Sequence, residues 1–188
     1  VNIEAGEIYQ YDPQEEASKK WPLDKGMVGG IVVNSDGTLI GVAQKGLFAF
    51  RPEDGSLVMS HAIEPDKPGN RPNDIGIFKL GDGSSRIVVG CIPVDRTILN
   101  PDEKPGVMYA VDIKTLELKP IRDDHVTSNA MCGYHDNGDN IIFYAETDKN
   151  NDPKIWKANY NADTEQIDNE EIFLRLEKFQ GGRPDGAS

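Results

Sequence analysis

"VGGIVVNSDGTLIGVAQKGLFAFRPEDGSLVMSHAI" (28–63) is a row of short apolar segments separated by tight turns. The segments are rich in Val, Ile and Phe, which favour a pleated, half-buried strand. The turns "NSDG" (34–37) and "PEDG" (52–55) place Gly after Asp, where a hairpin needs positive φ. The stretch therefore predicts an antiparallel sheet of four strands. Elsewhere, only "NEEIFLRLEKF" (169–179) is compatible with a turn of helix, so we expect an all-β fold.

The same order of strands and turns recurs further along the chain. A second unit joins 73–92 to 106–121, and a third joins 128–147 to 153–173, each with an Asp-Gly or Asn-Gly turn after its first strand. The opening segment, 6–23, matches the second half of such a unit. Four short antiparallel strands that recur every ~40 to 55 residues are typical of β-propeller blades.

Polar residues recur at the start of the first strand of these units. Asn73, Asn129 and Asp185 occupy corresponding places, and Gly29 stands at the matching place in the earlier unit. The first strand of each blade lines the central channel of a propeller, so these residues converge there. Amide and carboxylate oxygens around one axis suit a hard cation, calcium in particular. The alternative is that each residue only makes a turn, but their recurrence in register favours a site.

The loop "PGNRPND" (68–74) carries a guanidinium next to this predicted site. Arg71 lies two residues before Asn73, where it could contact a bound molecule. It could equally pair with one of the many acidic side chains of the surface, a contact that contributes little to stability.

Composition bounds the partners. The 188 residues are 37% hydrophobic, which suits one globular domain. Lys and Arg total 20 against 32 Asp and Glu, so the negative field predicts neither a nucleic-acid nor a membrane partner. The sequence has no apolar run of membrane-spanning length and no signal-peptide pattern at its start. Cys91 and Cys132, its two cysteines, are expected to be free thiols, so we predict a cytoplasmic location.

Four short blocks resemble those of a known family. "PGNRPND" (68–74), "SNAM" (128–131), "NGDNIIFYAETD" (137–148) and "RPDG" (183–186) follow one another as in the senescence marker protein (regucalcin), gluconolactonase and luciferin-regenerating enzyme-like family. The resemblance extends over nearly the whole chain. It implies a six-bladed β-propeller, of which this chain covers about four blades. We therefore expect residues 1–188 to be a single propeller domain whose parent extends beyond both ends.

The resemblance also implies a metal centre. In this family a divalent cation, commonly calcium, lies at the mouth of the channel, and a sugar lactone is hydrolysed above it. The matching positions make Asn129 and Asp185 the metal ligands, and Asp185 is also the candidate general base. Zinc or manganese are alternatives to calcium as the physiological ion.

The same comparison implies substrate contacts. Arg71 and Asn73 would contact the substrate, a small lactone, or an intervening water. Asp102 and Glu103, in the long insertion "VDRTILNPDEKPG" (94–106), would reach a substrate hydroxyl from a lid. Charged loop tips of this kind also commonly face only water.

Several positions depart from the family pattern. Ile75 and Ala130 stand where the family has Gly, and Cys91 stands where it has Thr, changes expected to affect packing more than ligation. The glutamate that is the family's first metal ligand, near its N-terminus, has no counterpart here.

The resemblance therefore implies a calcium-dependent lactone hydrolase in the full-length protein. Two alternatives remain open: a non-catalytic propeller that binds calcium or a partner, and a phosphotriesterase-like hydrolase that uses the same cation.

Overall fold

The structure is a computed structural model that describes residues 1–67, 69–93, 106–113, 115–125, 128–147, 153–176 and 185–186. Fourteen β-strands form in this part of the chain, and they pair into four antiparallel sheets. Across the same residues, no helix long and apolar enough to cross a membrane is present.

The strands follow one another along the chain. They are β1 (Glu7–Asp12), β2 (Ala17–Pro22), β3 (Val28–Val33), β4 (Leu39–Ala43), β5 (Gly46–Arg51), β6 (Ser56–His61), β7 (Asn70–Lys79), β8 (Ser85–Pro93), β9 (Gly106–Asp112), β10 (Leu118–His125), β11 (Ser128–Asp136), β12 (Asp139–Thr147), β13 (Pro153–Asn161) and β14 (Gln166–Arg175).

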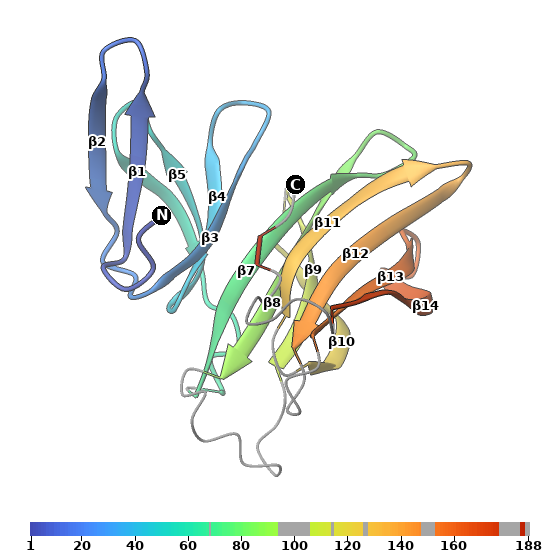
Figure 1. Cartoon of the computed structure of the whole chain (residues 1–188). Helices are drawn as coiled ribbons and strands as arrows, with labels where there is room; N and C mark the ends of the chain where they lie inside the picture. The colour runs from blue at the N-terminus through green and yellow to red at the C-terminus, as the bar shows by residue number, and fades with distance from the viewer. Residues whose placement is uncertain are drawn as a thin grey trace.

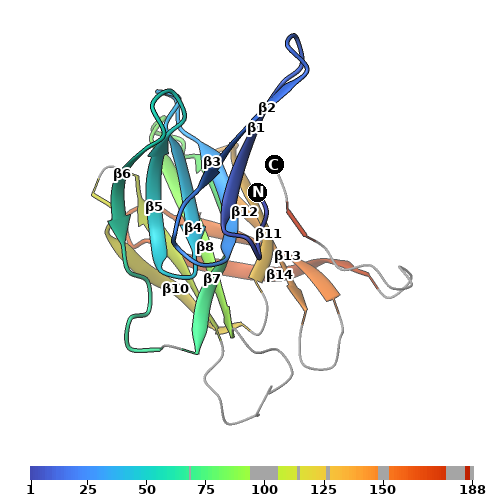
Figure 2. The same cartoon turned by 90° about the vertical axis from the view of Figure 1, so that its left-hand side faces the viewer.

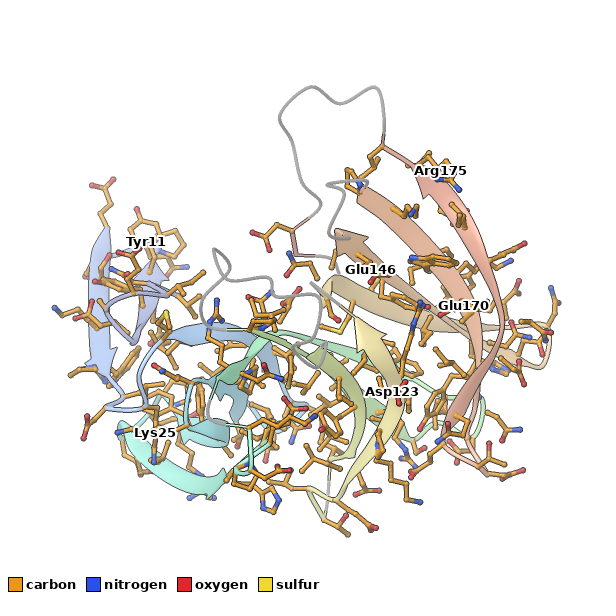
Figure 3. All side chains as sticks on the ribbon, turned by 90° about the horizontal axis from the view of Figure 1, so that it is seen from below. Tyr11, Lys25, Asp123, Glu146, Glu170 and Arg175 are labelled. Atoms are coloured by element: carbon orange, nitrogen blue, oxygen red, sulfur yellow. The ribbon has the colours of Figure 1, made fainter. Side chains whose placement is uncertain are left out.

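Each sheet is built from strands that are consecutive in sequence. The first sheet pairs β1 with β2, and the others have the orders β3-β4-β5-β6, β7-β8-β9-β10 and β11-β12-β13-β14 (Figure 1). Figure 2 looks at the sheet β3–β6 with the next sheet behind it. Seen from below, the four sheets follow one another round an arc (Figure 3). This is the arrangement of propeller blades, and it confirms the predicted all-β propeller with a half-blade at its start.

The first strands of the three four-stranded sheets, β3, β7 and β11, are the inner strands of the propeller. Neighbouring inner strands touch through their backbones. A Cβ added at Gly29 of β3 would lie 2.2 Å from the carbonyl oxygen of Asn73 in β7. A Cβ added at Gly76 of β7 would lie 2.0 Å from the carbonyl oxygen of Met131 in β11. Only glycine allows this approach, which explains why Gly29 stands where later units carry asparagine.

In the described part of the chain, the hydrophobic core lies between the sheets and is divided into three clusters. Ile8, Trp21 and Phe48 belong to the cluster between the first two sheets. Val42 and Val89 belong to the cluster between the second and third sheets. The cluster between the third and fourth sheets contains Phe78, Val88, Met108, Ile142, Tyr144 and Tyr160. Burial of these faces is the main driving force that holds one blade against the next.

A polar link also joins the last two sheets. Arg122 of β10 donates from Nη1 to the hydroxyl of Tyr144 at 2.6 Å and to the carboxylate of Glu170 in β14. Its Nη2 lies 3.9 Å from the carboxylate of Glu146, near the end of β12. Glu146 and Glu170 are labelled on the fourth sheet in Figure 3.

The turn of helix that the sequence allowed does not form over 169–175, because these residues belong to β14. β14 pairs with β13, with Trp156 opposite Ile172, so its backbone groups are bonded between strands rather than along a helix. Phe173 packs edge-on against Phe143 of β12, with ring centroids 5.0 Å apart. Cross-strand contacts of this kind outweigh a short helical pattern.

Candidate functional site

The three inner strands carry β-bulges at corresponding places. The register shifts fall between Val28 and Gly30, between Pro72 and Asp74, and between Asn129 and Cys132. Gly29 is the extra residue in β3 and Asn73 the extra residue in β7, while the shift in β11 begins at Asn129. A bulge bends its strand and re-aims the side chains around it. Gly29 and Asn73 therefore occupy equivalent backbone positions, and Asn129 borders the matching bulge in β11.

Asn73 and Asn129 are in direct contact. The Asn73 side-chain amide donates to Oδ1 of Asn129 and also, at 3.2 Å, to the carbonyl oxygen of Ser128. Asn129 is only 8% exposed, and Asn73 is half-buried. Two amides that are far apart in sequence thus meet between the inner ends of two blades, as the repeat predicts.

Asp74, next to Asn73, also links the two blades. Its Oδ1 accepts the N–H of Ile75 at 2.8 Å, and its Oδ2 accepts the N–H of Ala130 at 2.8 Å. Burial raises the pKa of the Asp74 carboxyl, and the nearby charge of Asp185 raises it further, whereas the two N–H donors act in the opposite direction. The Asp185 carboxylate therefore lies near enough to Asp74 for its charge to act on that carboxyl.

The other predicted residues are distributed differently. Arg71 is 8% exposed, and its Nη1 donates to the carbonyl oxygen of Pro72 at 3.1 Å, so it lies within the fold rather than on an exposed surface. Asp185 is exposed. Asp102 and Glu103 lie outside the described residues. The roles in binding and catalysis proposed for all four of these residues remain predictions.

The donor atoms suit a hard cation. Among the described residues, no group of three or more His, Cys, Asp or Glu side chains gathers closely enough to hold a metal ion. A cation at the inner ends of β7 and β11 would therefore depend on amide oxygens as well as carboxylates, and oxygen ligands of both kinds are what calcium accepts.

A buried glutamate outside the sequence prediction supports the loop before Arg71. The side chain of Glu64 is 2% exposed and lies 2.7 Å from Nζ of Lys67. Its carboxylate also accepts from the Asn70 amide at 3.0 Å and from the Tyr109 hydroxyl at 2.9 Å. Burial first, and Glu64 second, raise the pKa of both the Tyr109 hydroxyl and the Cys91 thiol, so both groups stay protonated beside the carboxylate. The spacing of Glu64 and Lys67 was the only local signal of this network.

The substituted family positions have distinct effects. Ile75 and Cys91 are buried in the core between the second and third sheets, as the expectation of changed packing requires. Both cysteines are free thiols, as predicted. Ala130, however, has a φ of 53°, in the left-handed region that glycine adopts without strain. Alanine in place of glycine at this position therefore strains the backbone, an effect that the sequence did not indicate.

Replacing Ala130 with glycine is therefore expected to stabilise the protein. Relief of the left-handed strain, less the added freedom of glycine in the unfolded chain, contributes about 1 kcal/mol. This corresponds to a rise in Tm of about 3 °C for a chain of this size. Thermal unfolding followed by circular dichroism measures the change. Ala158→Gly, in a buried position of β13, is the matched control and should lower Tm; a lower Tm for Ala130→Gly as well would contradict the strain.

The fold and these contacts define a β-propeller with side-chain oxygens gathered at the inner ends of its blades. A model of the family described as SMP-30/gluconolactonase/LRE-like region matches residues 1–188, and the chain belongs to this family. The resemblance carried by the sequence blocks is thereby confirmed.

Individual relatives agree with this assignment. A pentonolactonase of Haloferax volcanii is 30% identical over 95 residues, which are 50% of this chain and 30% of that protein. The calcium-binding protein regucalcin of Agrobacterium tumefaciens has a similar structure, with a TM-score of 0.74, 21% identity and coverage of 98% of this chain and 57% of its own. A gluconolactonase of Xanthomonas campestris gives a TM-score of 0.67 at 13% identity, over 98% of this chain and 59% of its own. The chain thus spans well under two thirds of each relative, and the two structural matches show the fold.

Proposed function

We propose that this chain is part of a divalent-cation-dependent hydrolase that opens a sugar lactone, with calcium as the cation. The observation that carries the proposal is the contact between the Asn73 and Asn129 amides, next to the Asp74 carboxylate and within electrostatic range of Asp185. Family membership supports it, as do the names of relatives that act on lactones or bind calcium.

Asn129 and Asp185 would hold the cation, and their oxygens fit it. When bound, such an ion acts as a Lewis acid that polarises a carbonyl oxygen and stabilises the negative charge that develops on it. Asn73 orients the Asn129 amide through its hydrogen bond. The site is short of carboxylates compared with high-affinity calcium sites, so we expect weak binding.

Asp185 would be the group that moves a proton. Its carboxylate is exposed, so a water molecule can reach it. As water attacks the lactone carbonyl carbon, Asp185 accepts the water proton. The ring carbon–oxygen bond then breaks, and the ring oxygen takes the proton to give a hydroxy acid. Arg71 and Asn73 orient the substrate during this step.

The experiment that tests the proposal uses the full-length protein with a panel of sugar lactones. Acid release is followed in a pH-stat with added calcium and with a chelator, against the spontaneous opening measured without protein. We expect opening at least about 10-fold faster with calcium than with the chelator, because the polarised carbonyl supplies several kcal/mol of transition-state stabilisation. Equal rates in both conditions would contradict the need for a cation.

Two outcomes would favour the alternatives. Stabilisation by calcium, about 2.7 kcal/mol at 100 times Kd, without opening of any lactone would favour a non-catalytic propeller. Cleavage of phosphotriesters in preference to lactones would favour the phosphotriesterase-like alternative, because the polarised oxygen would then belong to phosphorus.

A further inference from the structure

Consecutive residues of β7 hold Asn129 from two directions. Asn73 donates to the Asn129 side chain and to the carbonyl oxygen of Ser128, the residue before it. Asp74 accepts the N–H of Ala130, the residue after it. The backbone on both sides of Asn129 and the side chain itself are therefore fixed by one neighbouring strand.

The contact from Asp74 falls where the backbone of β11 needs support. The register of β11 shifts immediately after Asn129, and Ala130 adopts a φ of 53°. An alanine costs about 1 kcal/mol or more in this left-handed region, so an external contact must help to maintain it. The hydrogen bond to Asp74 Oδ2, at 2.8 Å, is such a contact.

Asp74 is itself held firmly. Its other oxygen accepts the N–H of Ile75, which fixes the side-chain rotamer relative to its own strand. On the opposite side, β3 approaches so closely that a Cβ added at Gly30 would lie 3.1 Å from Asp74 Oδ1. The carboxylate is therefore placed between β3 and β11, with little freedom to move away from Ala130.

We propose that Asp74 is a positioning residue that maintains the β11 bulge at Ala130 and so aims the amide of Asn129 at the cation site. The inference rests on the proposed function, because it takes Asn129 as a cation ligand. Asp74 acts through Ala130 rather than by touching the substrate. Residues that orient a metal ligand typically change metal affinity 10- to 100-fold when they are lost.

The test compares Asp74→Ala, Asp74→Asn and the double variant Asp74→Ala/Ala130→Gly in the full-length protein. Calcium affinity is measured by calorimetry, and lactone opening is resolved into kcat and KM. We expect Asp74→Ala to weaken calcium binding about 10-fold or more. A glycine in place of Ala130 adopts the left-handed conformation unaided, so the double variant should recover much of this loss. Asp74→Asn keeps the shape of the side chain and one acceptor oxygen, so its calcium affinity should lie between those of Asp74→Ala and the unaltered protein. It replaces Asp74→Ala in the test if that variant does not fold.

A measurement without metal separates this inference from the proposed function. In nuclear magnetic resonance spectra, Asp74→Ala should reduce the hydrogen-exchange protection of the Ala130 amide and shift the side-chain amide signals of Asn129. Unchanged signals, unchanged calcium affinity, or no recovery in the double variant would each overturn the inference. If the unaltered protein neither binds calcium nor opens lactones, the proposed function fails, whatever the spectra show.

Discussion

Replacing Asp185 with alanine is expected to lower kcat/KM for lactone opening by at least about 100-fold, the usual contribution of a general base. The same carboxylate is a proposed cation ligand, so calcium affinity should fall as well. Asp185 is exposed and its charge raises the pKa of Asp74, so its removal relieves repulsion within the fold. The loss of activity should therefore appear without a loss of stability.

The measurement is initial-rate kinetics over a range of lactone and calcium concentrations. Asp139→Ala is the matched control, because Asp139 is also exposed but lies at the far end of β12 from the Asn129 pairing. It should leave kcat/KM unchanged. Full activity of the Asp185 variant at saturating calcium would remove Asp185 from the chemistry and leave it at most an aid to cation binding.

The blades were predictable from the sequence because their turns are determined locally. Gly37, Gly55 and Gly83 all have positive φ, as the Asp-Gly turns require. In each turn the preceding aspartate accepts a backbone N–H two residues further on, at 2.8–2.9 Å. Signals that depend on adjacent residues can be recognised in a single sequence.

Part of the site was predictable for a different reason. Asn73 and Asn129 could be aligned because the blades repeat, and a repeat turns a contact between distant residues into a correspondence between positions. The bulges that aim the two side chains were not visible, because a register shift depends on how two strands pair. Asp74 was missed as a bridge, since its partner on β11 is 56 residues away.

The left-handed conformation of Ala130 could not be predicted from composition either. The resemblance showed only that glycine is usual there. A change from Gly to Ala adds one methyl group, which suggests a change of packing. The cost becomes apparent only once the φ of 53° is known.

The second large effect is expected for stability, at Glu64. Glu64→Ala should lower the free energy of unfolding by about 3 kcal/mol, because it leaves a partly buried cation and two hydrogen-bond donors without their acceptor. Lys67 is 26% exposed and can recover some hydration, but Asn70 and Tyr109 also donate to this carboxylate. For a chain of this size the change corresponds to a fall in Tm of about 9 °C.

Urea denaturation measures this effect, with Glu7→Ala as the control. Glu7 pairs with Lys20 at 3.0 Å, a distance similar to that in the Glu64 pair, but Lys20 is 54% exposed. Exposed pairs contribute about 0 to 1 kcal/mol, so the control should lose little. Glu64→Gln keeps the shape of the side chain but places an NH₂ group among hydrogen-bond donors. Its loss of stability should lie between those of Glu64→Ala and Glu7→Ala. Equal losses for Glu64→Ala and Glu7→Ala would mean that burial does not strengthen the Glu64 network, and that the loop before Arg71 is held by its backbone turns instead.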